Sequence, residues 1–173
     1  GAALGWSAGR YGQQYGAVSV RGYSGYFAQG SHATAVGYRA GQSYANSNTV
    51  AIGSDAGRWS QGLYSVAVGS LAGHSSQSSY AVAIGKYAGM FSQNTQSVAI
   101  GMYSGESLQG SYTVAIGYEA GRYRQNNYGV AIGREAGRTG QQSYGVAVGM
   151  GAGAVNQKIA SVALGFAAGY EKQ

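Results

Sequence analysis

A 16-residue repeat runs through the whole sequence and constrains the fold more than any other feature. Counted from Ala2, the units begin at residues 2, 18, 34, 50, 66, 82, 98, 114, 130, 146 and 162, and no insertion breaks the register. Ten units are complete, and an eleventh is truncated at Gln173. Such a period is typical of arrays in which each unit contacts only its neighbours. The sequence therefore predicts a single repeat domain over residues 1–173.

Some positions of the unit hardly vary, whereas others vary freely. Position 1 is Val in nine units, position 2 is Ala in ten, and position 3 is always Val, Ile or Leu. Position 8 is always Gly, position 4 is Gly except for Arg21, and position 12 is Gln except for Ala45. Positions 5, 6, 9, 10 and 11 change from unit to unit. This alternation of constrained and open positions is expected of stacked coils.

The Val-Ala-Ile segment alternates with period two, so it predicts a strand in which positions 1 and 3 share one face. Glycines at positions 4 and 8 provide backbone freedom for corners. We therefore predict an all-β parallel β-solenoid of eleven 16-residue coils. Positions 1 and 3 are expected to form its apolar core: Val50, Ile52, Val66, Val68, Val82, Ile84, Val98, Ile100, Val114, Ile116, Val130, Ile132, Val146 and Val148.

Position 2 then points away from the predicted core, yet it stays small. One interpretation is a face covered by a tight turn of the same chain. The other is a flat, apolar face that packs against identical subunits, which we favour. The predicted subunit interface consists of Ala51, Ala67, Ala83, Ala99, Ala115, Ala131, Ala147 and Ala163.

Two further columns carry larger side chains. Gln at position 12 is expected to form an amide ladder along the stack, with a ligand-reading row as the alternative. Aromatic residues recur at position 10, in Tyr11, Phe27, Trp59, Phe91 and Tyr123, and at position 15. Either column could be a stacked ladder or a row that contacts sugar rings. The candidate ligand surface consists of the position-15 residues Tyr64, Tyr80, Tyr112, Tyr128 and Tyr144.

Nothing in the sequence suggests catalysis, a metal site or a cofactor. There is no Cys, and the two histidines, His32 and His74, occupy variable columns. Glu119 and Glu135 share a column in adjacent units, but Arg122, Arg134 and Arg138 lie nearby, which favours a surface charge cluster over a glycosidase pair. The net charge of +6 is spread along the chain. No apolar run approaches the ~18 residues of a membrane helix, so membrane insertion is not expected.

The segments Ser97–Gly101, 65–69 and 113–117 read Ser-Val-Ala-Ile-Gly, Ser-Val-Ala-Val-Gly and Thr-Val-Ala-Ile-Gly. They resemble the head repeats of YadA-type trimeric autotransporter adhesins and similar repeats of phage and giant-virus fibres. The resemblance implies a trimeric, left-handed β-roll, with Val114 and Ile116 inside the roll and Ala115 toward the trimer axis. The family's repeats commonly have 14 residues, so this unit is longer.

These observations predict a non-enzymatic, extracellular segment of a fibre or adhesin, on a cell surface or a virion. It would act as a rigid homotrimeric rod for surface attachment or host recognition, with cell-surface polysaccharide or another host receptor as partner. Because the sequence starts at Gly1 rather than Met, we expect a fragment or a processed product. Two alternatives remain: a self-assembling extracellular filament, and an ice-binding solenoid. The latter needs a regular Thr array, whereas Thr is scattered over several columns here.

Overall fold

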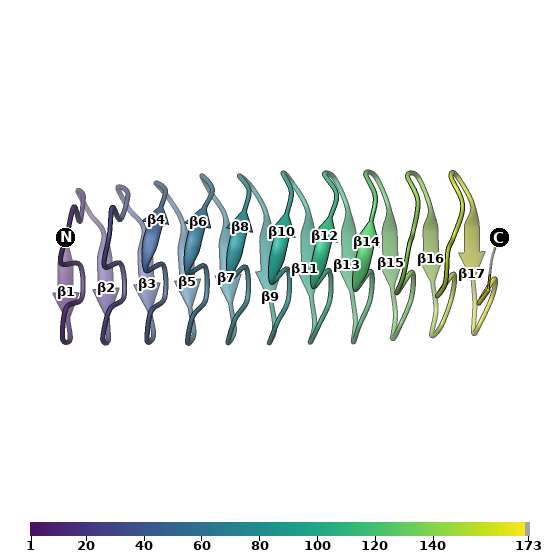
Figure 1. Cartoon of the computed structure of the whole chain (residues 1–173), viewed down its shortest axis with the longest axis horizontal. Coiled ribbons are helices and arrows are strands. Elements are labelled where there is room, and N and C mark those ends of the chain that lie inside the picture. Colours follow the sequence, from purple (N-terminus) through teal and green to yellow (C-terminus); the bar gives the residue numbers. More distant parts are fainter. Residues whose placement is uncertain (172–173) are drawn as a thin grey trace.

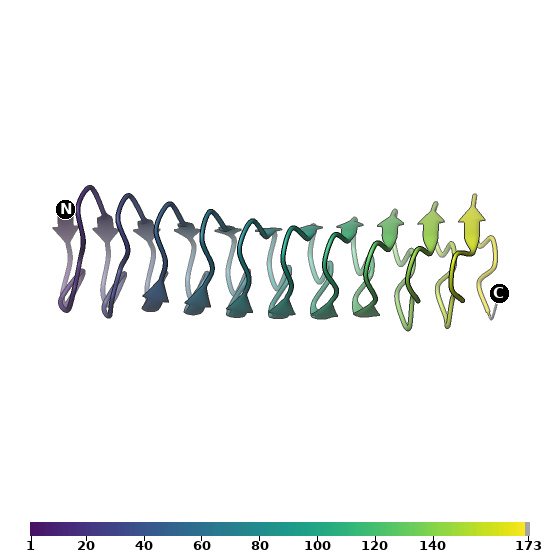
Figure 2. The ribbon, with the colours of Figure 1, turned by 90° about the horizontal axis from the view of Figure 1, so that it is seen from above.

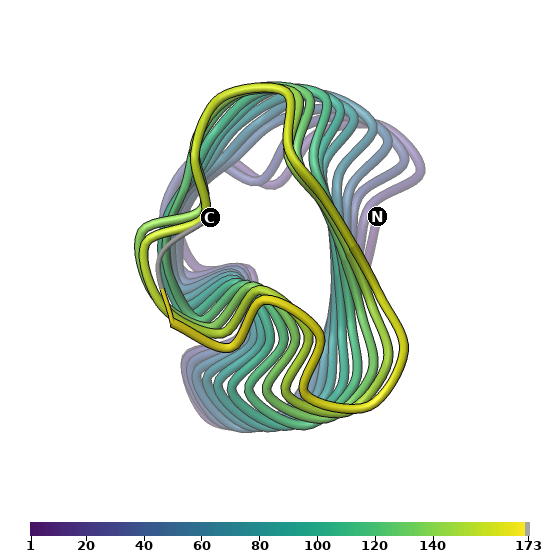
Figure 3. The same ribbon diagram turned by 90° about the vertical axis from the view of Figure 1, so that its right-hand side faces the viewer.

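The computed structural model describes residues 1–171 and shows an all-β parallel solenoid of about ten turns. Successive turns follow one another along a straight axis, with the two ends of the chain at opposite ends of the rod (Figure 1). Viewed along the axis, the turns overlap and rotate gradually (Figure 3). No helix is present in the described residues.

Two parallel sheets form the walls of the rod, and they lie on different sides of the coil (Figure 2). The larger, sheet A, has eleven strands: β1 (Ala2–Leu4), β2 (Val18–Val20), β3 (Thr34–Val36), β5 (Val50–Ile52), β7 (Val66–Val68), β9 (Val82–Ile84), β11 (Val98–Ile100), β13 (Val114–Ile116), β15 (Val130–Ile132), β16 (Val146–Val148) and β17 (Val162–Leu164). Sheet B has six: β4 (Ser43–Ala45), β6 (Trp59–Gln61), β8 (Ser75–Gln77), β10 (Phe91–Gln93), β12 (Ser107–Gln109) and β14 (Tyr123–Gln125).

The pairing register places like positions of successive units side by side. Val98 pairs with Val114, Ala99 with Ala115, and Ile100 with Ile116. In sheet B, Gln93 pairs with Gln109. Isolated bridges extend sheet B at both ends, from Tyr11–Phe27 to Val155–Glu171. Each column of the repeat is therefore a straight row of side chains along the rod.

The interior of the coil is narrow and contains only small side chains and glutamines. Every buried hydrophobic residue in the described chain is an alanine, and the largest fully buried side chains are those of Gln, Thr and Ser. The Nε2 of Gln93 donates hydrogen bonds to the carbonyl oxygens of Val82 (2.8 Å) and Ser97 (3.2 Å). The glutamines thus fill the coil and bond its opposite walls.

This arrangement contradicts the predicted core and the predicted subunit interface. The position-2 alanines lie inside the coil, with exposed fractions of 0–1 % from Ala51 to Ala163. The position-1 and position-3 residues lie on the outer face of sheet A, where Ile52 and Ile84 are 40 % and 38 % exposed. The predicted alternation is present, but the two faces are exchanged. The reason is space, because an interior already occupied by Gln has no room for Val and Ile.

The Gln ladder is confirmed in part. Side-chain amides bond along the stack in pairs, as in Gln77 Nε2 to Gln93 Oε1 (3.1 Å) and Gln141 Nε2 to Gln157 Oε1 (3.1 Å). The oxygens of Gln61, Gln77, Gln109 and Gln141 have no hydrogen-bond partner. Most of the bonding therefore runs across the coil to backbone carbonyls. The last glutamine of the column, Gln173, lies outside the described residues.

Single residues with left-handed backbone conformation make the corners. The conformation occurs at Gly positions such as Gly121 (φ +52°), and also at Glu119 (+55°), Arg124 (+56°) and Tyr128 (+60°). Conformation alone therefore does not explain the invariant glycine at position 8. A Cβ on Gly121 would lie 2.6 Å from the Oε1 of Gln125. Glycine is required there because the buried amide passes against the backbone.

Candidate functional site

The outer face of sheet A is an apolar surface that runs along the rod. We define the Val/Ile face as positions 1 and 3 of the eleven sheet A strands, from β1 to β17. No strand of sheet A contains a charged residue. At ~4.8 Å per strand, the face is roughly 50 Å long. Monomeric proteins rarely expose continuous apolar patches of more than several hundred Å², so this face is a candidate for association.

The predicted Tyr column lies at a corner of the coil and forms stacked pairs. Ring centroids are 5.2 Å apart in Tyr64–Tyr80, 5.1 Å in Tyr112–Tyr128 and 5.0 Å in Tyr128–Tyr144, with nearly parallel planes. All five rings are about half exposed. Because neighbouring rings cover each other's faces, a ligand would mainly meet ring edges and hydroxyl groups. The structure confirms the stacked-ladder interpretation of this column and leaves its role in ligand binding a prediction.

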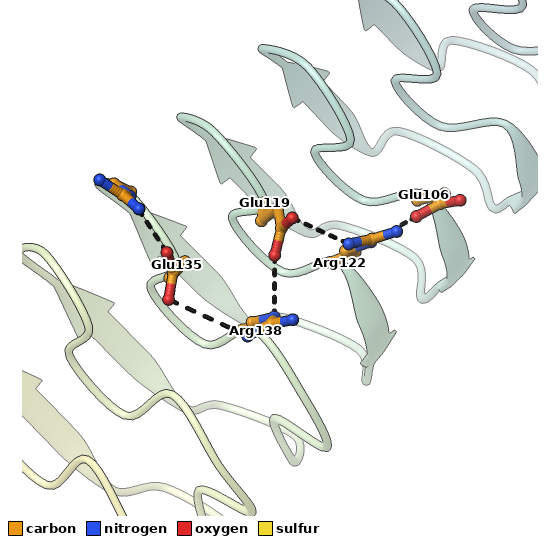
Figure 4. A network of polar contacts seen from close by, with 6 residues as sticks. Glu106, Glu119, Arg122, Glu135 and Arg138 are labelled. Carbon is orange, nitrogen blue, oxygen red and sulfur yellow. Dashed lines mark hydrogen bonds and ion pairs between the residues drawn. The ribbon is translucent and has the colours of Figure 1, made fainter.

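The predicted charge cluster is a chain of ion pairs along three turns (Figure 4). Arg122 contacts Glu106 and Glu119, at 2.8 Å to the Oε1 of Glu119. Arg138 contacts Glu119 at 2.9 Å and Glu135 at 3.9 Å. Arg134 contacts Glu135 at 3.0 Å, so three arginines balance three carboxylates along the row. The geometry supports a structural surface cluster.

Electrostatics at Arg122 reflect this cluster. Burial by itself lowers the pKa of Arg122, but the hydrogen bond to Glu106 and the charges of Glu106 and Glu119 outweigh it and raise the pKa. The guanidinium also lies over the rings of Tyr103 (4.6 Å) and Tyr123 (4.7 Å). Arg122 is therefore held permanently charged between acids and aromatic rings.

The two histidines lie far apart in the chain and contact aromatic rings. His32 packs edge-on against Tyr15, and His74 against Phe91. Burial lowers the pKa of His74, the charge of Arg58 lowers it further, and Asp55 partly opposes them. Within residues 1–171, no three His, Cys, Asp or Glu side chains gather in a way that could hold a metal ion. The described part of the chain also contains no helix able to span a bilayer.

Sequence reasoning missed the Val/Ile face as an exposed surface. The available signal was the Gln column, because a long side chain kept in nearly every unit needs interior space that Val and Ile would otherwise fill. No family model matches the sequence, and no curated protein or solved structure matches it either.

Proposed function

We propose that this chain is a non-enzymatic structural segment of an extracellular fibre or adhesin, which associates laterally with identical chains through the Val/Ile face. The observation that carries this proposal is the location of the large aliphatic side chains outside the coil. Ile52, Ile84 and Ile132 are 40 %, 38 % and 37 % exposed, while the interior contains alanine and glutamine. These Val and Ile side chains lie outside the closed coil, so they do not contribute to its interior.

Identical copies suit this face because it is uniform along the rod. Each strand of sheet A presents nearly the same pair of aliphatic side chains at the same spacing. Parallel copies in register would bury the same contact at every rung, and apolar burial contributes ~25 cal/mol per Å². The arrangement we propose is a homotrimer of left-handed rolls around a common axis, as the resemblance to YadA-type repeats implies, but with the Val/Ile face rather than the Ala column toward that axis.

The proposed role follows from shape. A straight rod whose length grows with repeat number, and whose surface varies at positions 5, 6 and 9–11, can serve as a spacer that presents side chains at regular intervals. Attachment to a cell surface or virion, and recognition of a host polysaccharide or receptor, belong to the same proposal.

The experiment that tests association is molar mass by light scattering at micromolar concentration. The wild-type chain is expected to run at three times its mass of 17.6 kDa. Ile84→Lys combined with Ile116→Lys should shift it to the monomer, because lysines would be buried unpaired in the interface. Leu108→Lys, which changes an apolar residue that is 54 % exposed on sheet B, is the matched control and should leave the mass unchanged.

A monomeric wild-type chain would overturn lateral association. A stable dimer would retain the Val/Ile face but replace the three-fold arrangement with two sheets packed face to face. Long continuous filaments in electron micrographs would instead favour end-to-end assembly.

A further inference from the structure

The outer row of sheet B alternates between aromatic residues and serine, with a period of two turns. Position 10 reads Phe27, Ser43, Trp59, Ser75, Phe91, Ser107 and Tyr123 along the rod. The pairing register confirms that these are direct neighbours: Trp59 pairs with Ser75, Phe91 pairs with Ser75 and Ser107, and Tyr123 pairs with Ser107. We call these seven residues the alternating row. Its rings recur at ~9.6 Å, twice the strand spacing.

The rings of the alternating row remain accessible. Phe27, Trp59 and Phe91 are 42 %, 40 % and 42 % exposed. Where aromatic residues occupy consecutive turns, as in Tyr11 and Phe27, the rings stack on each other at 5.3 Å. Serine on both sides of Trp59 and Phe91 prevents such stacking and leaves space for each ring along the sheet. Alternation therefore prevents ring-on-ring stacking at Trp59 and Phe91, while a guanidinium lies over one face of Trp59 and of Tyr123.

Two of the cations beside the row hold the rings and are themselves neutralised. Arg58 lies 4.7 Å from the ring centroid of Trp59, and Arg122 lies 4.7 Å from that of Tyr123. Arg58 is paired with Asp55 at 3.3 Å, and Arg122 with Glu106 and Glu119. Arg124, next to Tyr123 on β14, is exposed and has no ion pair among the described residues. From Trp59 to Ser107, however, the strands of the row contain no charged residue, which suits an uncharged ligand.

From this geometry we infer that the alternating row binds an extended, neutral β-1,4-linked polysaccharide lying along the rod. In such a chain each hexopyranose ring is turned over relative to the previous one, so the same face returns at every second sugar. The advance per sugar is close to one strand spacing of ~4.8 Å. One sugar would therefore match each turn, with every second ring over an aromatic residue and the intervening sugars beside serine hydroxyls.

The contacts expected are those of sugars with aromatic side chains in general. The C–H groups on a pyranose face carry partial positive charge and are attracted to the negative face of a π system. Ser75 and Ser107 are half-buried and can donate or accept hydrogen bonds with sugar hydroxyls. This inference rests on the proposed role in surface attachment and names its ligand class.

The experiment is depletion of the whole chain from solution by insoluble polysaccharides. Microcrystalline cellulose and chitin are the two β-1,4-linked probes, and insoluble starch is the α-linked comparison, in which successive rings keep one orientation. Binding to cellulose or chitin with much weaker binding to starch is the expected result. Absence of binding to both β-1,4-linked probes, or equal binding to starch, would overturn the inference.

Two variants test the row itself. Trp59→Ser with Phe91→Ser should raise the half-saturation concentration about tenfold, because two stacking platforms are removed. Ser75→Tyr adds a ring but should also weaken binding, since three consecutive rings would stack on each other. The matched control, Tyr38→Ser with Tyr87→Ser, removes two partly exposed rings that lie outside the alternating row and outside the position-15 column, and should bind as the wild type. An equal loss in the control would contradict the inference.

Light scattering and circular dichroism on the same samples separate the two proposals. Loss of polysaccharide binding at unchanged molar mass and unchanged fold would assign the effect to the row. A monomeric wild-type chain that still binds cellulose would overturn lateral association and leave the ligand inference standing. A trimer that binds neither cellulose nor chitin would overturn the ligand inference and leave lateral association standing.

Discussion

The Nε2 of Gln125 donates a 2.9 Å hydrogen bond to the carbonyl oxygen of Val114, across the interior of one coil. A second bond, of 3.0 Å, reaches the carbonyl oxygen of Gly129. One amide therefore links sheet B to sheet A and to the corner between them. With a buried Gln in this role, the opposing wall must present small side chains, and Ala115 lies there with an exposed fraction of 0 %.

The first prediction tests which face is inside. Ala115→Leu should lower the free energy of unfolding by about 3 kcal/mol, because the interior has no space for three more carbons. Val114→Leu, one residue earlier on the outer face, should change it by less than about 1 kcal/mol. Urea unfolding followed by circular dichroism measures both. If Val114→Leu were as damaging as Ala115→Leu, the alanine would not be the interior residue.

The second prediction concerns the invariant glycine of the corner. Gly121→Ala should destabilise the chain by about 2–4 kcal/mol, because the new Cβ meets the Gln125 amide and the backbone has a left-handed φ. Gly22→Ala is the control, since a Cβ there meets nothing closer than 3.7 Å and its φ is ordinary. Thermal melts compare the two. Similar melting temperatures for both variants would remove the close-approach argument.

The third prediction is a gain of stability. Ala45 is the one position-12 residue among the complete units that is not Gln, so its coil lacks the cross-coil amide. Ala45→Gln should add hydrogen bonds to the carbonyls of Thr34 and Thr49 and stabilise the chain by about 1 kcal/mol. Gln93→Ala makes the opposite change and should cost about 1–3 kcal/mol, because two buried carbonyls lose their donor. The denaturant midpoint of unfolding should rise in Ala45→Gln and fall in Gln93→Ala.

The fourth prediction concerns pH. The pKa of His74 is lowered from 6.5, first by burial and then by Arg58, so the folded state binds a proton more weakly than the unfolded chain. Stability contributed by neutral His74 is therefore present above pH 6.5 and declines as the pH falls below it. Melting temperatures between pH 5 and 8 should show this decline, and His74→Gln should flatten it. An unchanged profile in the variant would assign the decline to other groups.

Much of the architecture follows from the repeat alone. The 16-residue register predicts the pairing of Val98 with Val114, and the Val-Ala-Ile alternation predicts a strand with two distinct faces. The left-handed φ of Gly121 is likewise expected from the invariance of its column. Each inference depends on local geometry, which is encoded within a few residues and repeated in every unit.

The identity of the inner face is decided by the width of the coil. The period-two alternation indicates that Ala115 and Ile116 point in opposite directions. Because both faces are apolar, it does not indicate which of them lies inside the coil. Only the closed turn brings Gln125 opposite Ala115 and removes the volume that Ile116 would need. The alternating row shows the same division. Its residues can be identified in the sequence, whereas their alignment as neighbours along the outer wall of sheet B depends on the stacked turns.

The sequence by itself determined the period, the strands and the corners, because these arise from contacts within or between adjacent units. The tertiary structure decided which side chains face water, because that depends on how much volume a closed coil can enclose.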